Sequence, residues 1–151
     1  MALSRRFPIP FDVVFPNGAY LVSEVTPVHD FNASTRENKV QEVDKDTGKL
    51  LWQMDVLDAD PEAKRASKTV TVKIAANQQP VPPGNDGSSP FTPVLFEGLT
   101  ALPWIEASEN FSKISWSFRA ADVVTPPRRS VSVASASERP PAATSPKPTA
   151  A

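Results

Sequence analysis

The single histidine is the first candidate for acid–base chemistry. His29 lies in the segment VTPVHDF directly before Asp30, an order that would suit a base oriented by a carboxylate. Neighbouring residues of a strand point to opposite faces, so these two side chains would not readily pair. No GxSxG or similar motif supplies a nucleophile. We therefore interpret His29 as a surface residue at a strand end.

Two groups of carboxylates could offer oxygen ligands to a metal ion. Asp44, Asp46 and Gly48 resemble the start of a calcium loop, but the third ligand, the glycine at the proper offset and the closing glutamate are missing. The segment DADPE at residues 58–62 has another explanation, because negative charge is favourable in the first turn of a helix. We expect a solvated turn, a helix start and no metal site.

Cysteine and glycine usage excludes further kinds of chemistry. The chain has no cysteine, so it offers neither a thiolate nucleophile nor a Cys-based zinc site. Its five glycines are scattered one at a time and form no phosphate-binding loop. We expect a protein that is not an enzyme and that uses no cofactor.

Basic and hydroxyl side chains provide the one remaining signal for binding. Along three predicted strands the positions opposite the apolar ones carry four positive charges and one negative charge, which suits a phosphate backbone. The alternative is that these lysine and threonine side chains have no binding role and simply form the solvent-exposed side of the strands. The predicted nucleic-acid-binding residues are Arg36, Lys39, Lys49, Thr69, Thr71, Lys73, Trp104, Lys113 and Arg119.

Single-strand binding also requires exposed aromatic rings for base stacking. Trp52 and Trp116 are in register with apolar neighbours on their strands, so we expect both in the core. Trp104, which follows a proline at a predicted strand end, and Phe31 are the freer candidates.

Alternation of apolar and polar residues predicts the elements that position these side chains. Residues 68–75 (KTVTVKIA) alternate strictly, and residues 113–120 (KISWSFRA) place Ile114, Trp116 and Phe118 inward. In the strand at residues 50–57, Leu51 falls on the outward face. The remaining predicted strands are residues 19–28, 40–43 and 91–102.

Turn and helix signals complete the predicted fold. Residues 44–48 form a hairpin loop that ends on Gly48, a residue suited to positive φ. Residues 58–66 are the one short helix, with Asp60 as its N-cap. This order favours a mainly β domain, a small five- to six-stranded barrel like an OB-fold. An SH3-like barrel or a small sandwich fits the same signals.

Composition divides the 151-residue chain into three parts. Residues 1–14 form an extended N-terminal arm, residues 15–122 the single β-barrel domain, and residues 123–151 a disordered tail rich in Pro, Ala and Ser. Residues 1–122 hold 12 Lys/Arg against 16 Asp/Glu, and the tail holds 4 against 1. No apolar run is long enough to cross a bilayer. We expect a cytoplasmic protein that does not contact membranes.

Several blocks of sequence resemble a known family. The segments NGAYLVSEVTPVHDF, VDKDTGKLLWQMDVLDADPEA, TVTVKIAA, PFTPVLFEGLTALPW and ISWSFRA are similar to the actinobacterial plasmid replication, integration and excision activators. The resemblance covers roughly residues 18–120. It implies a small accessory protein of an integrative element, and it supplies no catalytic residue.

Two functional hypotheses follow from the residues and the resemblance together. In the first, the protein is a non-enzymatic accessory factor that promotes replication, integration and excision of a mobile element by binding DNA, with single strands preferred. In the alternative, it contacts a replication initiator or recombinase and binds no DNA, which the acidic balance of the domain favours. The expected partners are therefore DNA and element-encoded proteins, and the oligomeric state is left open.

Overall fold

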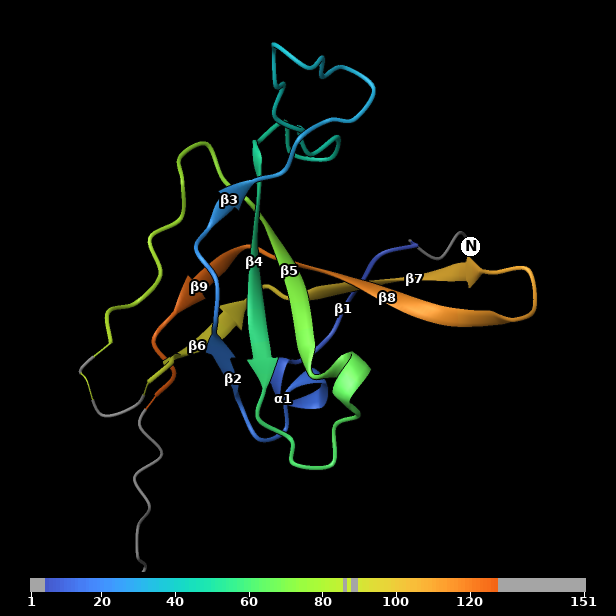
Figure 1. Cartoon of the computed structure of the whole chain (residues 1–151). Coiled ribbons are helices and arrows are strands. Elements are labelled where there is room, and N and C mark those ends of the chain that lie inside the picture. The colour runs from blue at the N-terminus through green and yellow to red at the C-terminus, as the bar shows by residue number, and fades with distance from the viewer. Residues whose placement is uncertain (1–4, 86, 88–89, 128–151) are drawn as a thin grey trace, which may run out of the picture.

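The computed structural model describes residues 5–85, 87 and 90–127. Within them the chain forms one mainly β domain, which confirms the predicted fold class at that level (Figure 1). The tail predicted for residues 128–151 lies outside the described residues. The elements are β1 Phe7–Pro8, α1 Phe11–Val14, β2 Ala19–Leu21, β3 Thr26–Pro27, β4 Leu51–Asp58, the 3₁₀ turn η1 Arg65–Ser67, β5 Thr69–Ala75, β6 Thr92–Glu97, β7 Thr100–Ala107, β8 Ser112–Ala120 and β9 Asp122–Val124.

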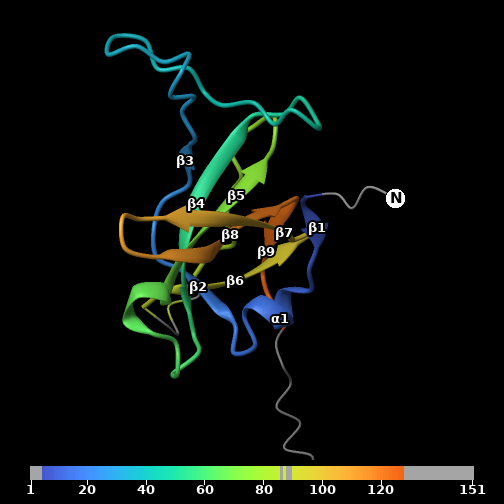
Figure 2. The same cartoon turned by 90° about the vertical axis from the view of Figure 1, so that its right-hand side faces the viewer.

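The strands form one nine-stranded sheet in the order β1-β7-β8-β5-β4-β2-β6-β9, with β3 paired to β4. The ladder between β5 and β8 is parallel and the other ladders are antiparallel. The sheet curls, so that β7 and β8 run across the direction of β4 and β5 (Figures 1 and 2). Its strand path has two ends, at β1 and β9, so the described ladders do not close a barrel. The strand number exceeds the predicted five or six.

The core lies inside the curl of the sheet. Val72 and Ile74 of β5 are buried, as their alternation predicts, and so are Met54 and Val56 of β4. Phe15 is 1 % exposed. Its ring lies 5.2 Å from that of Phe11 and 6.4 Å from that of Phe96, measured between centroids.

The described part of the segment predicted as an extended arm at residues 1–14 packs against the domain, first as the extended edge strand β1 and then as α1. Phe7 and Pro8 pair with the edge of β7. Pro10 then caps α1, where its fixed φ of −62° is already compatible with a helix start. Phe11 packs against the buried cluster, because an apolar side chain this close to the core gains by leaving water.

Two predicted strands are shorter in the structure. Residues 22–25 interrupt the strand predicted at residues 19–28, where Ser23 Oγ accepts the backbone N–H of Asp55 at 2.8 Å and so replaces a ladder bond. Residues 40–43 contribute only the single bridges His29–Gln41 and Val43–Leu50. The hairpin turn itself is present, with φ of +71° at Gly48.

The predicted helix at residues 58–66 is also wrong. Asp60 does accept a backbone N–H, that of Glu62 at 3.0 Å. The chain makes only turns there, followed by η1, since local carboxylate–amide bonds give the backbone an alternative to a helix.

At the C-terminal end, β9 buries Val123 to 4 % exposure, so the domain extends past the predicted boundary at residue 122.

Candidate functional site

An acidic turn covers part of the predicted DNA-binding face, at Arg119 and Lys73. Arg119 Nη1 donates to Asp44 Oδ1 at 2.6 Å and lies 3.9 Å from Asp46 Oδ2. Lys73 Nζ lies 3.9 Å from a carboxylate oxygen of Glu42. The cations of neighbouring strands do share a face, but the turn at residues 42–48 folds over that face and neutralises them.

Local hydrogen bonds hold Asp44 in position to make this contact. Its carboxylate accepts the hydroxyl of Thr47 at 2.8 Å and the backbone N–H of Asp46 at 3.3 Å. The backbone N–H of Gly48 donates to the carbonyl of Asp44 at 2.7 Å, and positive φ at the glycine allows this tight return. The turn therefore presents a preorganised carboxylate to β8.

Electrostatic effects at this cluster favour the ion pair. Burial opposes ionisation of Asp44, but the hydrogen bonds from Thr47 and Asp46 and the charge of Arg119 outweigh it, so the pKa of Asp44 lies below its ordinary value. Burial and the nearby Arg119 lower the pKa of Arg6. Arg119 is thus a structural residue, and its side chain is 21 % exposed.

The same turn explains why Leu51 is buried, although alternation places it on the face predicted to be exposed to water. Leu51 points to the outward face, yet it is 1 % exposed. It lines a hollow of about 350 Å³ together with Leu102, Arg119 and the acidic turn. A sheet face predicted to be wet is in part a second, smaller buried layer.

The other predicted DNA-binding residues do not gather into one site. Thr71 donates its hydroxyl to Asp55 at 2.6 Å, Thr69 is exposed, and Lys113 lies 3.2 Å from Glu106 on a separate part of the sheet. Arg36, Lys39 and Lys49 are exposed, and no ion pair with another described residue is seen for them. The structure thus leaves three of the predicted cations available, all in the segment between β3 and β4.

Several exposed apolar side chains lie together on a hairpin arm formed by β7 and β8. The ladders of β1 and β5 reach only Ala101 and Phe118, whereas β7 and β8 remain paired with each other as far as Ala107 and Ser112. In Figure 1 this hairpin extends away from the body, and Figure 2 turns that side of the molecule toward the viewer. Among the described strands, the outer part of the hairpin pairs only with itself.

One side of the arm continues the core side of the sheet. Ala101, which is fully buried, faces Phe118 in the ladder. Two residues further out, Pro103 faces Trp116, and the next pair on this side is Ile105 and Ile114. Phe7 packs edge-on against Trp116, with ring centroids 6.1 Å apart. We call this surface the open arm face: Phe7, Pro103, Ile105, Ile114 and Trp116.

Sequence alternation grouped Ile114 and Trp116 of this face with Phe118 and placed all three in the core, and it made no prediction for Ile105. Ile105 is 72 % exposed, Ile114 68 % and Trp116 49 %. Their period of two matches that of Phe118, which does pack against the core. The prediction of a buried Trp116 is wrong because the hairpin extends beyond the strands that would cover it.

The opposite side of the arm is polar around a single aromatic ring. Trp104 lies in the middle of β7, not at a strand end, and its exposed fraction of 48 % confirms that it is accessible. Ser115 faces it in the ladder and donates its hydroxyl to Glu106 at 2.7 Å. That bond and the contact with Lys113 lower the pKa of Glu106. We call this side the Trp104 face: Leu102, Trp104, Glu106, Lys113, Ser115 and Ser117.

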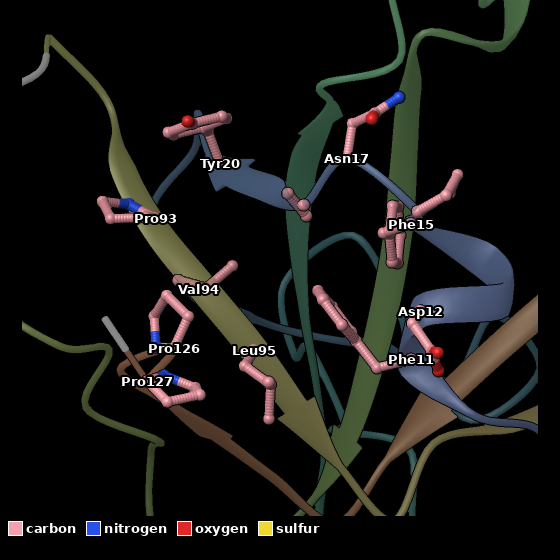
Figure 3. A pocket seen from close by; sticks show the side chains of 13 residues that line it. Phe11, Asp12, Phe15, Asn17, Tyr20, Pro93, Val94, Leu95, Pro126 and Pro127 are labelled. Carbon is pink, nitrogen blue, oxygen red and sulfur yellow. The ribbon is translucent and has the colours of Figure 1, made fainter. Parts of the chain in front are cut away.

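A groove of about 340 Å³ lies at the other end of the molecule, between α1, β2 and β6 (Figure 3). Phe11, Tyr20 and Pro93 line it, with Pro127 at the end of the described chain. Asp12 is the one carboxylate among the described residues that line it. An isolated carboxylate without an acid–base partner does not make a catalytic constellation.

Neither of the carboxylate groups in the sequence assembles a site for a metal ion. Asp58 accepts the backbone N–H of Asp60 at 3.0 Å, which uses the first carboxylate of that group locally. In the part of the chain that the structure describes, no three His, Cys, Asp or Glu side chains gather closely enough to hold a metal. No helix among the described residues has the length and apolar content needed to cross a bilayer.

Comparison with protein-family models, with curated proteins and with solved structures finds no match to this chain. The resemblance to plasmid replication, integration and excision activators therefore stays a prediction from sequence. The functional argument depends on the arm and on the distribution of charge.

Proposed function

We propose that this chain is a non-enzymatic protein-interaction protein and that the β7–β8 arm is its contact surface. The observation that carries the proposal is the arm itself, which extends beyond the body and exposes Trp104 on one side and the open arm face on the other. The largest contiguous exposed apolar patch of a monomeric protein covers about 300–600 Å² and is often a functional surface.

The composition of the arm matches that of protein interfaces. Tryptophan is enriched among the residues that dominate binding energy, and a polar rim surrounds the apolar centre of a typical interface. Trp104 has this setting, with Ser115 beside it and the Glu106–Lys113 pair next along the strands. A DNA interface would instead require free positive charge, and the described arm carries its lysine in an ion pair.

The resemblance stated above supplies the biological context of the proposal. In that context the partner is a replication initiator or a recombinase encoded by the same mobile element, and the protein promotes replication, integration and excision by assembling with it. This is the alternative hypothesis of the sequence analysis, and the pairing of Lys73 and Arg119 with carboxylates now favours it over the first.

The test uses purified proteins and one matched control. Binding of the chain to the initiator and to the recombinase encoded beside its gene is measured after nuclease treatment. Trp104→Ala should weaken binding about 30-fold, the effect of losing a residue worth about 2 kcal/mol. Phe31→Ala removes a ring that is 93 % exposed on a distant loop and should have no effect. Equal affinities for both variants and the parent chain would contradict the proposal.

DNA binding is a second candidate, supported by one observation. Phe31, Arg36 and Lys39 are exposed in the same loop, and an aromatic ring beside cations is the combination that holds single strands. The OB-fold-like barrel that would suit this function is also a proposal; the curl of the sheet supports it and the two open sheet ends weigh against it.

Fluorescent single-stranded oligonucleotides at two salt concentrations test this candidate. Arg36→Glu/Lys39→Glu should abolish salt-sensitive binding, whereas Lys73→Glu should have a smaller effect because Lys73 already faces a carboxylate. Absence of salt-sensitive binding by the parent chain removes the candidate.

A further inference from the structure

We propose that the open arm face holds a second copy of this chain, packed face to face about a two-fold axis. The inference rests on the proposed function, because it assigns one partner to one side of the same arm. The Trp104 face then remains accessible to the element-encoded partner.

Charge is the first argument for a second copy. None of the five residues of the open arm face is ionisable. The nearest charged residues of the hairpin, Glu106 and Lys113, lie on the opposite side and pair with each other at 3.2 Å. Two identical copies of a charge-free face meet without like-charge repulsion, whereas a charged partner would lose water without gaining an ion pair.

The apolar area of the face is the second argument. Trp116 is 49 % and Phe7 38 % exposed, which leaves about 200 Å² accessible at roughly 150–250 Å² per aromatic side chain. Ile105 and Ile114, each about 70 % exposed, contribute a similar amount, so the face offers on the order of 400 Å² of apolar surface.

This area is a large part of what a stable dimer requires. A standard interface uses about 800 Å² per partner, of which about 65 % is apolar in homodimers, or roughly 520 Å². The open arm face therefore supplies about three quarters of the apolar part of such an interface, and residues at its margin would complete it.

The shape of the arm suits a two-fold arrangement. A closed dimer uses the same patch on both copies, and two flat strand pairs pack face to face at a spacing of about 10 Å. Ile105 faces Ile114 across the ladder, so the pair forms a flat apolar platform beside Trp116. Stacking two such platforms removes both from water while the outer sides stay free.

The two tryptophans of the arm provide a matched pair of variants. Trp116 and Trp104 have nearly equal exposed fractions, 49 % and 48 %, and lie on opposite sides of the same hairpin. Sedimentation equilibrium of the full chain should show the mass rising toward twice 16.3 kDa with concentration. Trp116→Lys should raise the dimer dissociation constant at least about 30-fold, and Trp104→Lys should leave it unchanged. Trp116 also contacts the ring of Phe7, so a second variant at a more exposed site is needed. Ile114→Lys, at a side chain that is 68 % exposed, should raise the dimer dissociation constant in the same way.

The outcomes separate this inference from the proposed function. A parent chain that stays at 16.3 kDa over the whole concentration range, or equal dimerisation of the two tryptophan variants, overturns the inference. If Trp104→Ala still loses the element-encoded partner in that case, the proposed function stands alone. If the dimer responds only to Trp116→Lys and Ile114→Lys while no partner responds to Trp104, the inference stands and the proposed function fails.

Discussion

Replacing Asp44 with asparagine removes the charge that neutralises Arg119 but keeps an oxygen that can accept the hydroxyl of Thr47. Breaking a fully buried ion pair costs about 3–5 kcal/mol, because the remaining charge is left without a partner. The Arg119 side chain is 21 % exposed and Asp46 lies within 3.9 Å, so both water and a second carboxylate reduce the loss. We expect Asp44→Asn to lower the free energy of unfolding by about 2–4 kcal/mol.

Urea denaturation at pH 7 measures this loss, with Glu42→Gln as the control. Glu42 and Lys73 form the neighbouring pair at 3.9 Å, but both side chains are about a third exposed or more, and such pairs contribute at most about 1 kcal/mol. A loss below 1 kcal/mol for Asp44→Asn, or equal losses for the two variants, would refute the structural role of the acidic turn.

The same substitution predicts a pH dependence with a definite sign. Folding lowers the pKa of Asp44 below its ordinary value of 3.8. The ionised carboxylate therefore stabilises the folded chain above that value, and the stabilisation is lost as pH falls through the lowered pKa. The difference in stability between the parent chain and Asp44→Asn should be constant near neutral pH and shrink at more acidic pH. A difference that grows on acidification would contradict this assignment.

Three further substitutions and one control test the fold. Gly98→Ala should lower the free energy of unfolding by about 1–3 kcal/mol, because φ is +60° and the new Cβ would lie 2.9 Å from that of Ala121. Gly48→Ala is the control: its φ is +71° but the space around it is open, so its loss in the same thermal unfolding experiment should be smaller. Val123→Ala should lower the free energy of unfolding by about 2 kcal/mol in a denaturation experiment, because Val123 of β9 is buried in the core. An unchanged stability would contradict this burial. Trp52→Phe should cost about 1 kcal/mol, the net value of the hydrogen bond from its indole N–H to a backbone carbonyl at 3.0 Å, and an unchanged unfolding midpoint would show that this bond contributes nothing.

Local alternation predicted β4, β5 and β8, but the single strand predicted at residues 91–102 is divided into β6 and β7, and β7 continues to Ala107. The pattern at residues 68–75 gives β5, and the pattern at residues 113–120 gives β8. Period two identifies the side chains that share a face, which is why Ile114, Trp116 and Phe118 were grouped correctly. The period carries no information on how far the neighbouring strands extend. The pairing of β5 with β8 ends at Phe118, so only this residue of the three packs against the core.

The electrostatic cluster required information that local sequence does not carry. Asp44 and Arg119 are 75 residues apart, and nothing in either segment specifies that the turn folds over the sheet. The fold of the chain brings the acidic turn together with the cations Arg119 and Lys73. The limits of the domain failed for a similar reason, because single apolar residues such as Phe11 and Val123 become core only through contacts with distant strands.

Backbone hydrogen exchange along the chain, measured with and without the element-encoded partner, tests the central claim most directly. If the arm is the contact surface, exchange should slow within Thr100–Ala107 and Ser112–Ala120 when the partner is added, while the loop that carries Phe31 is unaffected. Slower exchange in that loop, with no change in β7 and β8, would contradict the account.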